Sequence, residues 1–111
     1  MILLITSRAT RKQLEEMQQA LKTYIKLAVD IRLGILAGGG LLHADCESVL
    51  LENGSEQEDV WGADLIPATQ QVTFESLINL RPRQKNFALD ITDPTIRKQV
   101  EQVARELLGG I

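Results

Sequence analysis

Residues 25–40 read IKLAVDIRLGILAGGG, and this stretch decides the fold. Apolar and other residues alternate from Ile25 to Arg32, which places one side of the segment in the core and the other largely in water, as in a half-buried β-strand. Gly34 interrupts the chain before a second apolar run, and the three glycines at 38–40 end that run. We therefore expect a tight hairpin that joins two strands.

Further apolar segments extend the predicted sheet. A short buried strand is expected at residues 2–5, before polar residues begin a turn. Downstream, we expect strands at residues 60–66 and 72–80, each closed by a proline, and an edge strand at 87–91. These strands are predicted to pair antiparallel, giving a sheet of about four or five strands.

Helices are predicted at both ends of the chain. Thr10 and Gln13 have the spacing of a capping box, and apolar residues then recur every three or four positions, so the first helix is expected over residues 10–23. Asp93 as N-cap and Pro94 at the first helical position begin a last helix, whose apolar residues again share one face. A pair of glycines near the end of the chain stops this helix.

The middle of the chain contains a segment with two interpretations. Residues 43–53 fit helical spacing better than alternation, and Asn53-Gly54 is a natural helix end. The alternative is a strand that turns at the same dipeptide, which is also a strong hairpin signal. With a helix here, the chain is an α+β domain: a largely antiparallel sheet with N-terminal, middle and C-terminal helices packed on one face.

The composition predicts a single globular domain. The chain has 111 residues, of which 44% are hydrophobic and only 4% aromatic, so its core is mostly aliphatic. A lone Cys46 allows no internal disulfide, and the apolar run at residues 1–5 is too short for a signal peptide or a membrane span. We therefore expect a cytoplasmic protein without membrane contact. A pI of about 5.1 argues against nucleic-acid binding, which usually requires a basic surface.

Charge is unevenly distributed along the chain. Residues 33–80 contain eight acids and no lysine or arginine, together with the only histidine, cysteine and tryptophan, and all twelve basic residues lie outside this stretch. Such segregation concerns partners rather than fold. It predicts a cation site, a basic partner, or docking of the acidic middle onto the chain's own basic flanks.

Four side chains that can ligate a metal fall within five residues, from His43 to Glu47. If the segment is helical, His43 and Glu47 stand one turn apart on one face, a spacing that suits a divalent metal with Asp45 as a further ligand. The possible distal ligands, Glu52, Asp59 or Asp64, follow no known spacing. The alternative is structural: Asp45 and Glu47 complement the helix N-terminus, Cys46 packs as a small apolar residue, and His43 bonds a nearby carbonyl.

The acidic stretch ends abruptly in a basic, amide-rich segment, NLRPRQKN, at residues 79–86. Arginine forks hold carboxylates or phosphates bidentately, and a proline restricts the loop, so the segment resembles a clamp for a small anionic ligand. Its candidate binding residues are Asn79, Arg81, Arg83, Gln84 and Asn86. The alternative is a solvated loop whose cations answer nearby acids. Trp61 is a further candidate, either as a core or interface anchor or as a surface on which a ligand stacks.

A set of short motifs is similar to one known family. The motifs are GILAGG at 34–39, HADCE at 43–47, GSxQxxxWG at 54–62, INxRPxQ at 78–84 and DP at 93–94. Together they resemble a family of small bacterial proteins, well represented in cyanobacteria, that is catalogued as a domain of unknown function. The resemblance implies a bacterial, cytoplasmic, stand-alone domain. It implies no activity and assigns no residue a role.

Two functions are compatible with these patterns. The first is a non-enzymatic binding or interaction module, expected as a homodimer, in which the acidic middle meets the basic loop across a pocket or a subunit interface. The second is a metal-dependent, hydrolase-like enzyme with His43, Asp45 and Glu47 as ligands and Arg81 or Arg83 holding an anionic substrate. The position of His43 relative to Arg81 is the most useful observation, because shared walls would join two weak motifs into one site.

Overall fold

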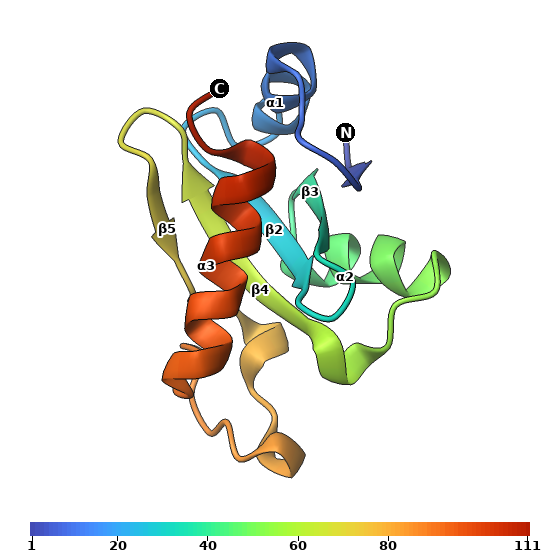
Figure 1. Ribbon diagram of the computed structural model, residues 1–111, viewed down its shortest axis with the longest axis vertical. Helices are drawn as coiled ribbons and strands as arrows, with labels where there is room; N and C mark the ends of the chain where they lie inside the picture. The colour runs from blue at the N-terminus through green and yellow to red at the C-terminus, as the bar shows by residue number, and fades with distance from the viewer.

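The computed structural model describes residues 1–111 as a five-stranded antiparallel sheet with three α-helices (Figure 1). The strands are β1 (Leu3–Ile5), β2 (Ile25–Asp30), β3 (Ile35–Gly40), β4 (Val60–Ile66) and β5 (Gln71–Thr73), in the order β1-β3-β2-β4-β5. The helices are α1 (Arg11–Gln18), α2 (His43–Glu52) and α3 (Pro94–Leu108), and the short 3-10 helices are η1 (Gln57–Asp59), η2 (Leu77–Asn79) and η3 (Pro82–Gln84). The α+β class predicted from the sequence is confirmed.

The predicted hairpin at residues 25–40 forms the centre of the sheet. β2 lies between β3 and β4 and pairs antiparallel with both. Asp30 orders the hairpin turn, because its Oδ1 accepts hydrogen bonds from the backbone N–H groups of Arg32 and Leu33, each at 2.9 Å. Gly34 adopts φ +68° just before β3 begins, a conformation that glycine adopts without steric cost. The strand with the clearest alternation is therefore the one on which the other strands are assembled.

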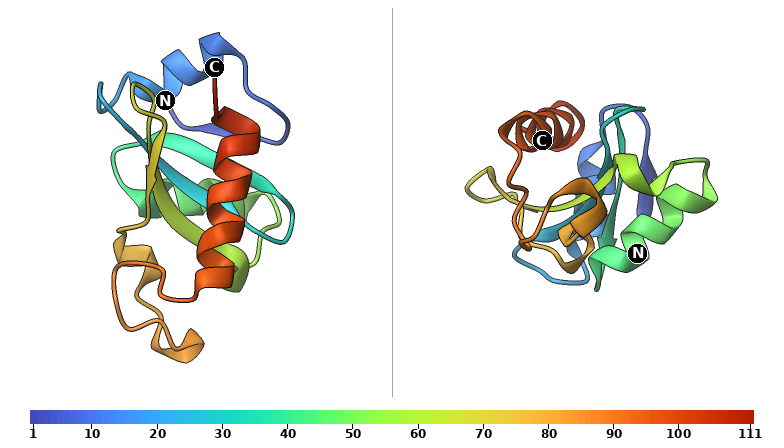
Figure 2. Two further views of the ribbon diagram at one scale, coloured as in Figure 1. Left: turned by 60° about the vertical axis from the view of Figure 1, so that its left-hand side comes forward. Right: turned by 90° about the horizontal axis from the view of Figure 1, so that it is seen from below.

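The helices cover both faces of the sheet, not one. Leu27 and Val29 of β2 point into the larger core, which α1 and α3 complete, whereas Ala28 points into a second core beneath α2. Figure 2 shows α3 and α2 on opposite sides of the strands. The prediction that all helices pack on one face is therefore wrong. The side of β2 expected to lie largely in water carries Ala28 and Asp30, which are fully buried because α2 and its following loop cover them.

Small residues allow α2 to lie close to the sheet. Ala28 of β2 is paired with Ala37 of β3 on one side and with Gly62 of β4 on the other, so three small residues stand side by side. Sγ of Cys46, on α2, lies 3.2 Å from the point where a Cβ on Gly40 would stand. A larger residue at these positions would push the helix away from the strands.

The glycines at 38–40 end the apolar run as predicted, and they do so as the last three residues of β3. Pairing with β2 continues through them, with Gly38 opposite Leu27 and Gly40 opposite Lys26. A Cβ on Gly39, which has φ +103°, would overlap the backbone of the N-terminal residue and the Cα of Met17. The glycines are thus needed for close approach by neighbouring segments rather than for a turn.

The structure confirms where the predicted helices begin. Thr10 forms the capping box with Gln13, in which each side chain accepts a hydrogen bond from the other residue's backbone N–H. Asp93 caps α3, and the middle segment forms α2, which excludes the alternative strand. α1 is shorter than the predicted range 10–23, since the chain leaves the helix before Lys22, at φ +67°. None of the helices combines the length and the apolar character needed to cross a membrane.

The predicted strands at 72–80 and 87–91 are wrong in most of their length. β5 pairs with β4 over Gln71–Thr73 only, and 3-10 helices follow it. Asn86 holds the 87–91 segment as a loop, because its Nδ2 donates to the carbonyls of Ala88 and Asp90. The apolar residues of these two segments therefore form no further strand, because 3-10 helices and side-chain hydrogen bonds take the place of strand pairing.

Candidate functional site

Asn79 takes the place of a neighbouring strand beside β4. Its Oδ1 accepts a hydrogen bond from the Gly62 N–H at 2.8 Å, and its Nδ2 donates to the carbonyls of Gly62 at 3.0 Å and Phe74 at 2.8 Å. The side-chain amide thus pairs with β4 as a peptide group would. A Cβ on Gly62 would stand 2.6 Å from the Cβ of Ser76, so glycine is needed for this approach. Asn79 is fully buried and has no N–H left for a ligand.

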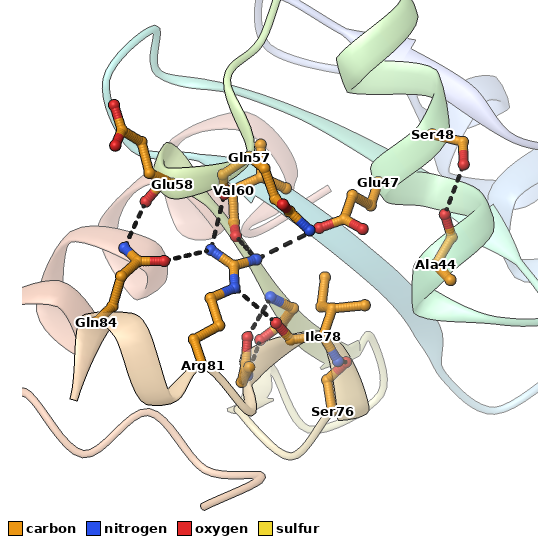
Figure 3. A network of polar contacts seen from close by, with 12 residues as sticks. Ala44, Glu47, Ser48, Gln57, Glu58, Val60, Ser76, Ile78, Arg81 and Gln84 are labelled. Carbon is orange, nitrogen blue, oxygen red and sulfur yellow. Dashed lines mark hydrogen bonds and ion pairs between the residues drawn. The ribbon is translucent and has the colours of Figure 1, made fainter. Parts of the chain in front are cut away.

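Arg81 fastens the same loop to β4, to η1 and to α2 (Figure 3). Its donors reach five acceptors: Ile78 O at 2.8 Å from Nε, Gln57 O at 2.7 Å and Gln84 Oε1 at 3.3 Å from Nη1, and Val60 O and Glu47 Oε2 from Nη2, the latter at 3.3 Å. Every N–H of the guanidinium therefore has a partner. An anionic ligand could bind Arg81 only by displacing one of them.

The ion pair between Arg81 and Glu47 is buried at both ends, with side-chain exposures of 9% and 12%. Burial raises the pKa of the Glu47 carboxyl, and the charge of Arg81 opposes this only in part. Burial likewise lowers the pKa of Arg81, and Glu47 opposes that shift. Loss of hydration thus outweighs the attraction for both groups, so the pair fixes the position of the loop more than it lowers the energy of the fold.

Trp61 lies in the core and not on a ligand-facing surface. Its side chain is almost fully buried, and the guanidinium carbon of Arg81 lies 4.6 Å from its ring centroid, within cation–π range. Of the two interpretations of Trp61, this arrangement matches the core anchor.

The remaining residues of the 79–86 segment differ in how they are used. The Nδ2 of Asn86 donates to Asn79 O at 2.6 Å, and the Nε2 of Gln84 donates to a carbonyl of η1 at 3.0 Å. Arg83 is exposed and makes no hydrogen bond or ion pair within the chain. It borders a depression of about 830 Å³ lined by polar residues and Pro82: Glu56, Gln57, Glu58, Arg81, Pro82, Arg83 and Gln84. Of the two arginines in the predicted anion clamp, only Arg83 has a free guanidinium.

The structure does not bring His43, Asp45 and Glu47 together as a ligand set. Glu47 pairs with Arg81, whereas Asp45 is exposed in the first turn of α2. His43 turns to β4, where its Nε2 lies 2.8 Å from Oδ1 of Asp64. Glu47 therefore faces the 79–86 segment, and His43 faces a different cavity.

One acidic trio does gather, at η1. Ligating atoms of Glu56, Glu58 and Asp59 lie within 4.8 Å of one another, and no other such group of three exists in the chain. Asp59 is already paired with Arg32 at 2.9 Å, a contact that raises the pKa of the guanidinium. Together with the pair between Glu47 and Arg81, this contact shows that the acidic middle docks partly onto the chain's own basic flanks.

A cleft of about 460 Å³ lies between the start of α2, strands β2 and β4, and the loop after β5. The Nε2 of His43 faces two acceptors there, Oδ1 of Asp64 at 2.8 Å and the Ala63 carbonyl at 3.2 Å. Since both neighbours accept, Nε2 carries a proton, and in the neutral ring Nδ1 is an acceptor without a partner in the chain. Lys26 also borders the cleft, and its Nζ donates to Leu41 O at 3.0 Å.

The walls of this cleft are mainly apolar and partly exposed. Its apolar lining consists of Tyr24, Leu42, Ala44, Leu77, Ile78 and Leu89, and its polar lining consists of Lys26, His43, Asp64, Glu75 and Ser76. Leu42, just before α2, is 57% exposed, and Leu77, in η2, is 77% exposed. Exposed leucines gathered around a concave surface with a few convergent polar groups are typical of binding sites.

The polar groups of the cleft are placed for binding rather than for nucleophilic attack. Ser76 Oγ accepts a hydrogen bond from the Ile78 N–H at 3.3 Å and makes none with His43. Sγ of Cys46 points away, toward the Lys26 carbonyl at 3.5 Å. Burial raises the pKa of this thiol, which keeps it protonated and unreactive.

Sequence patterns point to His43 but not to most of the cleft. Asp64 is among the possible distal metal ligands named from the sequence, and the structure brings it to His43. Leu77 and Leu89 fall in predicted strands that do not form there. No linear pattern marks the cleft leucines as surface residues, because Leu42 fits the helical spacing of the middle segment and Leu77 and Leu89 fall within apolar runs. Only their exposure in the folded chain distinguishes them from core residues.

The fold and the cleft define a small α+β domain with an apolar surface site beside its middle helix. The chain belongs to the family described as protein of unknown function (DUF5674), whose model matches residues 3–107. The resemblance to a family of unknown function is thereby confirmed, while the bacterial and cyanobacterial source it implies stays a prediction. No curated protein and no solved structure matches the chain.

Proposed function

We propose that this protein is a non-enzymatic binding module whose site is the cleft beside α2. The observation that carries the proposal is that two exposed leucines, Leu42 and Leu77, line the same cleft as the His43–Asp64 pair. Burying such side chains against a partner is favourable, at about 1.5 kcal/mol or more for each leucine. Hydrogen bonds to the His43–Asp64 pair would fix the orientation of a bound group.

The charges of the cleft favour a ligand that is apolar and positively charged. Asp64 and Glu75 contribute two carboxylates, and His43 adds a free acceptor nitrogen. The single cation, Lys26, uses one of its protons on a backbone carbonyl. An apolar group that carries an amine or guanidinium could therefore contact the apolar lining and pair with the carboxylates of the cleft.

The 79–86 segment supports this role by shaping one wall. Asn79 and Arg81 use their donors within the chain, so they hold the loop that presents Leu77 and Leu89 instead of contacting a ligand. Rigid walls reduce the entropy lost on binding.

The proposal is tested with 2-phenylethylamine, a small probe that combines an aromatic ring with an ammonium group. We expect saturable amide shifts in ¹H–¹⁵N spectra centred on His43, Asp64 and Leu77. The Leu77→Ser variant is expected to lose them, and Leu51→Ser, which alters an exposed leucine of α2 outside the cleft, is expected to keep them. Absence of saturable shifts from the chain in its monomeric form, or equal shifts in both variants, would remove the cleft as the binding site.

A cytoplasmic location belongs to the same proposal. It is supported by Cys46, which is free and buried and would gain nothing from an oxidising compartment. The expected result is that an affinity-tagged chain expressed in its source cell fractionates with cytoplasmic markers, and recovery with an exported fraction would contradict it.

A further inference from the structure

We propose that the occupant of the cleft is a second copy of this chain, which inserts the turn around Phe87. This inference rests on the proposed function, because it names the partner of the same site. It is carried by complementary polarity and charge: an exposed aromatic residue lies near unpaired cations in the sequence, and an apolar cleft is lined by the unpaired carboxylate of Glu75.

Phe87 is the inserted side chain. It is 70% exposed, so it fills no cavity of its own chain. Lys85, two residues earlier and in a left-handed conformation at φ +59°, is exposed, and so is Arg83. Neither of these cations has a side-chain partner, so the chain near the exposed Phe87 carries two unpaired cations, and we call this segment, residues 83–87, the knob.

The turn that carries Phe87 is held in place before any partner arrives. Arg81 and Asn86 form an antiparallel bridge, with N–H···O distances of 2.8 and 3.0 Å in the two directions. The side chain of Asn86 also accepts from Thr92 Oγ1 at 2.8 Å, in addition to its three donated bonds. A knob on a preformed turn loses little conformational entropy when it docks.

The receiving cleft complements this knob in both respects. Leu42, Leu77 and Leu89 supply apolar walls, and Glu75 is an exposed carboxylate at the cleft without a partner in its own chain. Lys85 of one copy can therefore face Glu75 of the other. The acidic middle of the sequence would then meet the basic flank of a second molecule as well as its own.

The placement of knob and cleft suits a closed dimer. Leu89 lines the cleft only two residues after Phe87, so the inserted residue and the receiving cleft belong to one region of the surface. In a two-fold dimer each copy inserts its Phe87 into the other, and the interface closes on itself. Two reciprocal insertions bury about twice the surface of one insertion and leave no free cleft to propagate a filament.

Sedimentation equilibrium from about 1 µM to about 1 mM tests the proposal, since this range covers weak to moderate association. The wild-type chain is expected to form a dimer. Phe87→Ser is expected to raise the dimer Kd about 100-fold or more, because two phenylalanine side chains lose their burial. Leu51→Ser, outside the cleft, is the matched control and is expected to leave Kd unchanged.

Charge reversal tests the pairing directly. Lys85→Glu and Glu75→Lys are each expected to weaken the dimer about five-fold, and the double variant is expected to recover most of the loss. Both side chains are exposed, so neither change threatens the fold. A double variant no tighter than either single variant would overturn the pairing.

The two proposals fail in different ways. A wild-type chain that stays monomeric at the highest concentration, or a dimer that Phe87→Ser leaves intact, overturns the second copy as occupant. In either case binding of 2-phenylethylamine is then measured on Phe87→Ser, which has no phenylalanine side chain to occupy the cleft. If that variant binds the probe, the cleft remains a binding site for another partner, and if it does not, the proposed function falls as well.

Discussion

Replacing Arg81 by methionine removes one guanidinium and keeps a side chain of similar length over the ring of Trp61. The substitution leaves five acceptors without their donor, on η1, η2, η3, β4 and α2. Two of these partners, Gln57 and Gln84, are exposed, so water can replace the lost contacts there. The carbonyls of Val60 and Ile78 and the carboxylate of Glu47 are less accessible and carry most of the cost.

The expected loss of unfolding free energy is about 5 kcal/mol, from the lower values for two buried carbonyls and one stranded carboxylate. An unsatisfied buried acceptor costs about 1 to 3 kcal/mol, and stranding one partner of a buried ion pair costs about 3 to 5 kcal/mol in measured cases. Because the Glu47 side chain is still 12% exposed, we take the lower end of the ion-pair range for its contribution. Since a domain of this size has about 5 to 15 kcal/mol in total, the variant would be strongly destabilised.

Urea unfolding followed by far-UV circular dichroism measures this loss. Arg83→Met is the matched control, because Arg83 lies on the same loop, is exposed and bonds nothing, and its replacement is expected to change stability by less than about 0.5 kcal/mol. Circular dichroism is preferred to fluorescence, since Trp61 contacts Arg81 and its emission would change for local reasons.

Glu47→Leu combined with Arg81→Met isolates the buried charge. Because hydration loss dominates for both groups, removing Glu47 from the Arg81→Met background is expected to restore about 1 to 2 kcal/mol. An Arg81→Met chain as stable as Arg83→Met would refute the assignment of Arg81 as the residue that fastens the loop.

Three further predictions concern the same region. Gly62→Ala is expected to destabilise the chain by about 2 kcal/mol, because its Cβ would overlap Ser76, and a thermal midpoint equal to wild type would contradict this. Asn79→Ala is expected to cost about 3 kcal/mol, measured by urea unfolding, since it leaves the peptide groups of Gly62 without partners; a cost below that of an exposed asparagine would contradict it. Glu47 has a folded-state pKa above its unfolded value, so the native state binds its proton more tightly and stability falls as pH rises from the ordinary glutamate pKa through the higher native one. Glu47→Gln is expected to abolish that decrease, and pH-dependent unfolding curves of identical slope for wild type and variant would contradict the assignment.

The parts of the fold that the sequence predicted depend on local patterns. Alternation predicted β2, a capping box predicted the start of α1, and Asp93-Pro94 predicted the start of α3. Each of these signals lies within a few consecutive residues, and the structure satisfies each with local hydrogen bonds or with one buried face. Local chemistry is therefore sufficient for these elements.

The errors all involve contacts between distant segments. Residues 72–80 alternate like a strand, but Asn79 pairs its side chain with Gly62, and the chain then turns into 3-10 helices. The second core beneath α2 depends on Ala28 lying beside small residues of β3 and β4. Neither arrangement is visible in a linear pattern, because each requires knowing which strands are adjacent.

The candidate site shows the same limit. The basic segment at 79–86 has the composition of an anion clamp, yet Arg81 and Asn79 use their hydrogen bonds to hold a loop. The exposed leucines of the cleft, by contrast, read in the sequence as ordinary members of apolar runs. Burial separates these cases: polar side chains that are buried are structural here, and apolar side chains that are exposed mark the site.

The most direct test of the cleft as a binding site for a second copy is an isotope-filtered NOE experiment on an equimolar mixture of labelled and unlabelled protein. The account predicts intermolecular NOEs between the ring protons of Phe87 in one molecule and the methyl groups of Leu42, Leu77 and Leu89 in the other, and their loss when the unlabelled chain carries Phe87→Ser. Intermolecular NOEs that join other surfaces, or none at concentrations where a dimer sediments, would contradict it.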